Sequence, residues 1–357
     1  MINCLIIAKN YGKEKILNKS LIDRFIDKNK NIDNFYVMID KTVLINYKEN
    51  IVYNVNYIYE NEIEDLHKYI GINDRLVVIY DDIYLEDGLP VDMLKSQINY
   101  RVKDKLFCLN MIDVINKSFK NIKEYKGIDF YCIDNDLDFY ILSKEIIKGR
   151  NLDLIEKGVY ILDIDSVFID EDCIIGEGSI IYPNSIIECG SKIGKNCKIS
   201  GRLKNVSIKN RVEIENSFVS DSIICDDVHI GPYSFIHHDC MINDNSYVGS
   251  YVEMKKSIMG NNVKVKHQSV LLDSFIGNNV NIGAGVITAN YDGTMKHITR
   301  INDNAFIGCN SVLIAPLSIG KRAFVAADTT ITRDVKDDEF VISRIEQINK
   351  KRRRNNL

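Results

Sequence analysis

The central and C-terminal parts of the chain carry an aliphatic residue at every sixth position. The first series is unbroken and comprises Ile169, Ile175, Ile181, Ile187, Ile193 and Ile199. The spacing returns at Ile224, Ile230, Ile236, Ile242 and Val248, and again at Ile301, Ile307, Leu313, Ile319, Val325 and Ile331. A period of six matches neither an amphipathic helix nor an alternating strand. It predicts a solenoid in which three short strands make one three-sided coil of about 18 residues.

A small side chain follows most of these aliphatic residues four positions later. The members of this second series are Cys173, Ser179, Ser185, Ser191, Cys197, Val228, Ser234, Cys240 and Ser246. We expect the aliphatic residues to point inward and stack between coils, and the small residues to fit beside the turns. Burying one Ile contributes roughly 1.5–3 kcal/mol, so the repeats suffice for a core.

The first 135 residues have a different pattern. Apolar strand-like runs at 4–8, 35–39 and 76–80 alternate with predicted helices at 16–25 and 91–100. This alternation predicts a small α/β domain with a mainly parallel sheet. We therefore expect an α/β domain over 1–135, a linker helix over 136–158, a β-helix over 159–344 and a basic tail over 345–357.

Composition restricts the possible partners and the compartment. The net charge of −4 and a pI of about 5.9 give no indication of a nucleic-acid partner. The chain has no apolar run long enough to span a membrane and no signal-peptide pattern, so we expect a cytoplasmic protein. Its nine Cys include no CxxC pair and are predicted to be reduced thiols.

One histidine and one insertion are candidates for chemistry. His267 lies between Lys255 and Asn281, and residues 289–297 interrupt the repeat shortly afterwards. Residues about 14 apart in a coil of about 18 lie in neighbouring layers, so we expect His267, Asn281 and the loop to converge on one edge. A neutral imidazole can accept a proton from an amine, and lysines can bind a phosphate.

The segment 231–344 resembles a known family without gaps. The matching motifs are Val252-Glu253-Met254-Lys255-Lys256, Val280-Asn281-Ile282-Gly283-Ala284-Gly285, Thr288-Ala289-Asn290-Tyr291-Asp292-Gly293 and Ala315-Pro316. They resemble the acetyltransferase half of the bifunctional bacterial glucosamine-1-phosphate acetyltransferase / N-acetylglucosamine-1-phosphate uridyltransferase family. The resemblance implies a left-handed parallel β-helix and a homotrimer with sites between subunits. It also implies acetyl-CoA as co-substrate, in the synthesis of UDP-N-acetylglucosamine for the cell wall.

The resemblance also implies roles for individual residues. His267 falls on the general base that deprotonates the amino group of glucosamine 1-phosphate. Lys255, Asn281 and Lys296 fall on substrate-binding positions. The positions that fall on acetyl-CoA contacts are Ala284, Asn290, Tyr291, Cys309, Ala327 and Arg344.

Three positions depart from the family. His237 stands where the family has a substrate-binding Arg, Val270 where it has a substrate-contacting Tyr, and Cys309 where it has a Ser. These changes leave open a different amino-sugar or nucleotide-sugar acceptor, or a non-catalytic trimeric paralogue that binds a sugar nucleotide.

The N-terminal part departs further from the family. It is shorter, and only one Gly stands in the segment Lys9–Lys13, where the family has a Gly-rich phosphate-binding loop. Asp82 resembles the family's Mg²⁺ ligand. We expect uridyl transfer to be absent and Mg²⁺ to be unnecessary for acetyl transfer.

Overall fold

The computed structural model describes residues 1–8, 14–17, 19–39, 51, 53, 55–59, 69–70, 74–80, 83–85, 88–95, 100–102, 106–110, 122–124, 130–343 and 347–349. Two compact units make up the chain, Met1–Gly149 and Arg150–Leu357. Helix α5 (Asp136–Glu156) runs through the boundary between them. Asp82, Arg344 and residues 350–357, which include most of the predicted basic tail, lie outside the described residues. Among the helices of the described residues, none has the length and apolar composition needed to cross a bilayer.

The first unit is built on a seven-stranded sheet with the order β10-β8-β9-β6-β1-β4-β5. The interior strand β1 (Ile2–Ile7) pairs in parallel with both β4 (Asn34–Ile39) and β6 (Arg75–Tyr80). These are the three strands predicted from the sequence, and the prediction is confirmed. The remaining strands of this sheet are β5 (Asn56–Tyr59), β8 (Tyr100–Val102), β9 (Leu106–Asn110) and β10 (Lys123–Glu124). Strands β7 (Ile83–Leu85) and β11 (Phe130–Cys132) form a separate antiparallel pair.

The first helix begins later than the predicted range of 16–25. Helix α1 spans Leu21–Lys28, because the Oγ of Ser20 accepts a hydrogen bond from the backbone N–H of Asp23 at 3.0 Å and caps the helix there. The residues before the cap form the short hairpin of β2 (Lys15–Ile16) and β3 (Lys19–Ser20). In the second predicted helix, 91–100, residues 91–95 form α3 (Val91–Lys95), whereas Tyr100 already belongs to a strand.

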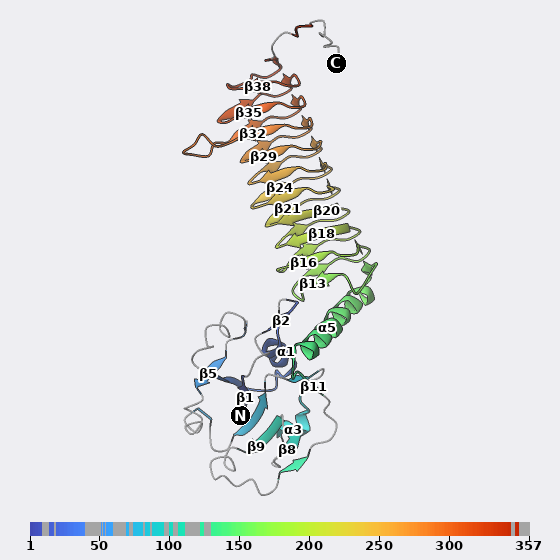
Figure 1. The fold of residues 1–357 in the computed structure, drawn as a ribbon, viewed down its shortest axis with the longest axis vertical. Coiled ribbons are helices and arrows are strands. Elements are labelled where there is room, and N and C mark those ends of the chain that lie inside the picture. Colours follow the sequence, from blue (N-terminus) through green and yellow to red (C-terminus); the bar gives the residue numbers. More distant parts are fainter. Residues whose placement is uncertain are drawn as a thin grey trace, which may run out of the picture. The chain divides into compact units, whose positions relative to one another are not determined.

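The second unit is a left-handed parallel β-helix, as predicted. Figure 1 shows its coils stacked from β13 to β38. Strands of the first face are β12 (Tyr160–Ile161), β15 (Ile180–Ile181), β22 (His229–Ile230), β25 (Tyr247–Val248), β28 (Lys264–Val265), β31 (Asn281–Ile282), β34 (Phe306–Ile307), β37 (Phe324–Val325) and β39 (Phe340–Val341). Strands of the second face are β13 (Phe168–Ile169), β16 (Ile186–Glu188), β23 (Phe235–His237), β26 (Glu253–Lys255), β29 (Val270–Leu272), β32 (Ile287–Ala289), β35 (Val312–Ile314) and β38 (Thr330–Ile331).

The third face is a separate nine-stranded sheet. Its strands are β14 (Ile174–Ile175), β17 (Lys192–Ile193), β19 (Ser207–Ile208), β21 (Ser222–Ile224), β24 (Cys240–Ile242), β27 (Ile258–Met259), β30 (Ser274–Ile276), β33 (Thr299–Ile301) and β36 (Leu317–Ile319). Two longer strands, β18 (Lys198–Lys204) and β20 (Glu213–Ser220), each pair with strands of both the first and the second face.

The core of the solenoid consists of the six-residue series. Every aliphatic residue of that series is at most 8% exposed, which confirms the predicted inward orientation. The small residues have an additional role that the spacing did not indicate. The Oγ of Ser234, for example, donates to the carbonyl oxygen of Gly249 at 2.6 Å and accepts from the N–H of Val252 at 3.3 Å. Serine therefore satisfies backbone groups of the next coil inside the turn, where Ala would leave them unpaired.

Candidate functional site

One corner of the solenoid brings four predicted site residues into a single column. The inward-pointing residues Val265, Ile282, Ile307 and Val325 pair in register on successive coils. Each of the four site residues stands two positions after one of them. The four residues, which we call the His267 column, are His267, Ala284, Cys309 and Ala327. Backbone hydrogen bonds link their coils: Gly285 N to His267 O at 3.0 Å, Asn310 N to Ala284 O at 2.8 Å and Asp328 N to Cys309 O at 2.7 Å. A catalytic candidate thus shares one edge with three proposed acetyl-CoA contacts.

His267 lies at the bend between β28 and β29, where the first face meets the second. Its side chain is exposed, and within the described part of the chain no hydrogen bond to its imidazole is found. The ring is therefore accessible and can accept a proton from an incoming amine. The neighbouring Gln268 has a φ of 56°, which makes the tight turn after the histidine.

The inserted loop leaves the solenoid at a different corner, between the second and third faces. It begins at the end of β32 with Asn290, which is 8% exposed and donates from Nδ2 to Asp273. Figure 1 shows this loop extending sideways beside the label β32. Tyr291 and Lys296 pair across it as an antiparallel bridge, and both side chains are exposed.

Asp292 holds the tip of this loop together. Its Oδ1 accepts from the backbone N–H groups of Thr294 at 2.8 Å and Met295 at 2.7 Å, and its Oδ2 lies 2.6 Å from His297 Nε2. The hydrogen bond from Met295, followed by those from His297 and Thr294, lowers the pKa of the Asp292 carboxyl. The loop therefore has a defined turn that presents Tyr291 and Lys296 to solvent.

A polar cluster lies on β23 and β26 of the second face, three and two coils before the loop. His237 pairs in register with Lys255, and Glu253 with Val270. His237 is 7% exposed, stacks on Phe235 with ring centroids 4.0 Å apart and has its Nε2 3.3 Å from Glu253 Oε1. Burial, more than any other cause, lowers the pKa of His237. This side chain is therefore held against a carboxylate and lacks the two-pronged donor of an Arg.

Within one chain the predicted site residues around His267 and those on the inserted loop form two separate groups. His267 lies at the first–second corner and Asn281 on the first face, whereas the loop lies at the second–third corner. The expected convergence of His267, Asn281 and the loop on one edge is wrong for a single chain. The spacing of about 14 residues between His267 and Asn281 correctly placed these two residues in neighbouring coils. It did not show that the inserted loop leaves the solenoid at another corner.

On β29, β32 and β35 the second face between these two corners is apolar. Its outward positions form two in-register rows, and Ile287 and Ile314 are each 41% exposed. The rows are Val270, Ile287 and Val312, and Leu272, Ala289 and Ile314. This surface was not predicted, although its signal is visible in the sequence: both neighbours of Leu271 and Leu313 are apolar, where a polar residue is usual.

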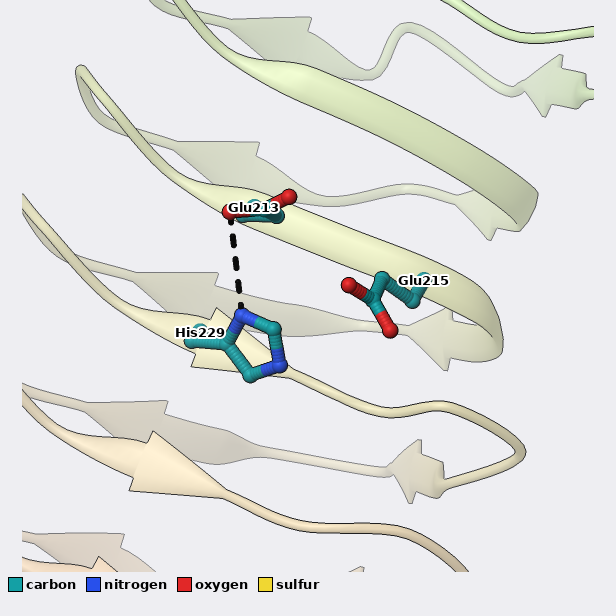
Figure 2. Close-up of side chains that lie close together, drawn as sticks. All are labelled: Glu213, Glu215 and His229. Atoms are coloured by element: carbon teal, nitrogen blue, oxygen red, sulfur yellow. Dashed lines mark ion pairs between the residues drawn. The ribbon is translucent and has the colours of Figure 1, made fainter.

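A possible cation-binding cluster lies away from these residues. Glu213, Glu215 and His229 have potential ligand atoms within 4.8 Å of one another, and Figure 2 shows their side chains grouped between two coils. Lys198 Nζ lies 3.6 Å from one Glu213 oxygen, and His229 Nδ1 lies 3.9 Å from the other. Glu213 thus already has two basic neighbours, so its charge does not require a metal.

The chain is similar in sequence to several known proteins. Residues 164–274 match the family model "GMPPB C-terminal domain". The chain is 38% identical to the bifunctional protein GlmU of Thermosipho melanesiensis over 80% of this chain and 63% of that protein. It is 33% identical to the GlmU of Thermodesulfovibrio yellowstonii over 95% of this chain and 76% of that protein. The chain spans less than two thirds of the length of the first of these relatives. A solved UDP-N-acetylglucosamine acyltransferase of Francisella novicida is 21% identical, with a TM-score of 0.38 over 49% of this chain and 63% of that chain.

Proposed function

The chain belongs to the family of bifunctional GlmU proteins, and we propose that it transfers the acetyl group of acetyl-CoA to the amino group of glucosamine 1-phosphate. The product would serve UDP-N-acetylglucosamine and cell-wall precursor synthesis. The observation that carries this proposal is the His267 column, which aligns an accessible imidazole with the small residues Ala284, Cys309 and Ala327 on successive coils. Small side chains along an edge leave room for the extended arm of coenzyme A.

The proposed chemistry is direct acyl transfer. The imidazole of His267 accepts a proton from the acceptor amine while the amine nitrogen attacks the thioester carbonyl. The new C–N bond forms, the C–S bond breaks, and the proton on His267 passes to the departing thiolate of coenzyme A. Lys255 and Lys296 would bind the sugar phosphate, and Asn281 the sugar. Asn290, Tyr291 and Arg344 would complete the acetyl-CoA site.

We propose a homotrimer as the active form. The apolar second face lies between the corner of His267 and the corner of Asn290. If three copies turn this face toward a common threefold axis, the His267 corner of each copy lies beside the Asn290 corner of its neighbour. This arrangement would bring together the two groups that a single chain keeps apart. An exposed apolar sheet face of this kind is typical of a protein interface.

One observation favours a second candidate, an acetyltransferase for a different amino-sugar or nucleotide-sugar acceptor. His237 is buried and held by Glu253, so it offers no cationic fork for a phosphate. Val270 adds no hydroxyl to the same face. An acceptor with a neutral group at this position would suit these two residues better than one with a phosphate.

Thiol release from acetyl-CoA tests both candidates. The purified chain is incubated with glucosamine 1-phosphate, with glucosamine and with amino sugars linked to a nucleoside diphosphate. Fastest release with glucosamine 1-phosphate supports the first candidate, and fastest release with another acceptor supports the second. No release with any acceptor contradicts both and favours a non-catalytic trimer. Pyrophosphate exchange with UTP, assayed with Mg²⁺ present, is expected to be absent.

A further inference from the structure

Three phenylalanine rings form an exposed ladder on the first face near the C-terminal end of the solenoid. The Phe306 and Phe324 centroids lie 4.5 Å apart with an interplanar angle of 9°, and the Phe324 and Phe340 centroids lie 5.6 Å apart at 24°. The exposed fraction rises along the ladder from 37% to 42% and 63%. Stacked rings in water at the outer surface of a sheet suggest a surface that a ligand or partner covers.

The ladder runs directly beside the His267 column. Phe306 pairs in register with Asn281, and Phe324 pairs with Phe306 and Phe340. Cys309 and Ala327 follow Phe306 and Phe324 by three residues, so these two rings share their coils with small residues of the His267 column. Strands β28, β31, β34, β37 and β39 are consecutive rungs, which places Phe340 roughly 19 Å along the axis from the rung of His267.

Among the described residues, Phe340 is the last ring of the ladder. In the described part of the chain β39 is the last strand of the sheet, so Phe340 has a stacking partner on one side, Phe324. A flat aromatic ring can occupy the next position and continue the stack, because every nucleobase presents a π-face to an aromatic side chain.

We propose that this ladder, with Phe340 as its terminal ring, binds the adenine base of acetyl-CoA. The inference rests on the proposed function. The thioester then lies at His267, the pantetheine arm follows Ala284, Cys309 and Ala327, and the base stacks at Phe340. The long arm of coenzyme A separates its reactive sulfur from its base, which fits a base site several rungs from the catalytic histidine.

The width of the ladder favours a flat ring over a second protein chain. It is one side chain wide on two-residue strands, and on one flank Arg322 and Asp338 form an exposed ion pair at 2.6 Å. A stable protein interface buries about 800 Å² on each partner, which this narrow strip beside a charged pair does not offer. A planar base needs only the face of one ring.

Calorimetric binding of two probes, coenzyme A and pantetheine, tests this proposal on the full chain. Pantetheine has the arm and thiol but no nucleotide. Phe340→Ala is expected to weaken coenzyme A binding roughly 5- to 150-fold and to leave pantetheine binding unchanged. Phe340→Leu, which keeps an apolar side chain without a ring, is expected to lose affinity in the same selective way. Phe275→Ala is the control, because Phe275 is another exposed phenylalanine, 37% exposed, but lies on the third face.

Several outcomes would overturn the base site. One is equal weakening of both probes by Phe340→Ala, and another is no weakening by either Phe340 variant. A change of molecular mass in solution caused by the Phe340 variants would show that the ladder contacts another copy of the chain. Failure of the unmodified chain to bind coenzyme A would overturn the base site together with the acetyl-CoA proposal. Selective loss at Phe340 in a chain that acetylates no acceptor would support the base site and contradict only the proposed reaction.

Discussion

The backbone N–H of Gly285 donates to the carbonyl oxygen of His267 at 3.0 Å. This bond joins two successive coils and sets the catalytic candidate directly beside Ala284 in the next coil. Equivalent backbone hydrogen bonds join the following coils at the same corner, from Asn310 N to Ala284 O and from Asp328 N to Cys309 O. The positions of the four column residues therefore depend on the regular stacking of coils, and less on side-chain contacts among them.

His267→Ala should abolish most acetyl transfer without unfolding the protein. Loss of a general base lowers the rate roughly 10²–10⁴-fold, and an exposed side chain without described partners contributes little to stability. Thiol release and thermal unfolding measure the two effects. Gln268→Ala, at the adjacent exposed position, should keep both activity and Tm. Unchanged turnover in His267→Ala would refute its role as base.

Ile287→Glu should disrupt the proposed trimer. The side chain is 41% exposed in one chain, and a carboxylate buried at a symmetric interface would face its own copies without a counter-charge. Light scattering after size exclusion should show a smaller particle, and acetyl transfer should fall with it. Ile258→Glu provides the control, since Ile258 is 39% exposed on the third face. A trimer that survives Ile287→Glu would mean that another face forms the interface.

Gly283→Ala should destabilise the solenoid. A Cβ at this position would lie 2.5 Å from the backbone nitrogen of Cys309 and 2.9 Å from its Cα, so two coils would have to separate. Overpacking of this kind costs typically 1–3 kcal/mol. Urea unfolding is the measurement. Gly149→Ala is the contrasting variant, because nothing lies within 4 Å of its Cβ and Ala favours the helix by about 0.5–1 kcal/mol. Equal midpoints for the two variants would contradict the packing argument.

His237 should make stability depend on pH. Burial lowers the pKa of His237 below the usual value of 6.5; the hydrogen bond to Glu253 opposes this shift, and His238 and Lys255 add to it. As pH falls below about 6.5, the unfolded chain takes up a proton that the folded chain does not, so the folded state loses stability. The slope for one such group is at most about 1.4 kcal/mol per pH unit. Urea midpoints at pH 7.5 and 5.5 should differ less in His237→Gln than in the unmodified chain. An identical difference in both proteins would show that His237 titrates normally.

The α/β unit shows how local chemistry limits prediction from sequence. Strands at β1, β4 and β6 were predictable because continuous apolar runs such as Cys4–Ala8 are typical of buried parallel strands. The start of α1 was not, because the apolar pattern from Ile16 onward suits a helix. The cap at Ser20 and the hairpin before it decided the boundary.

The six-residue period alone determined the solenoid and its core, because an aliphatic residue recurring at that interval can be buried only when three short strands close each coil. It also identified the layer of each candidate residue. Only the tertiary structure showed at which corner of the solenoid each residue lies. That position depends on how many strands and bends separate His267 from Asn290 and on where the inserted loop leaves the coil. The tertiary structure also placed the apolar rows between the two corners and aligned the three phenylalanine rings beside the His267 column. Both arrangements join residues that are distant along the chain and adjacent in space.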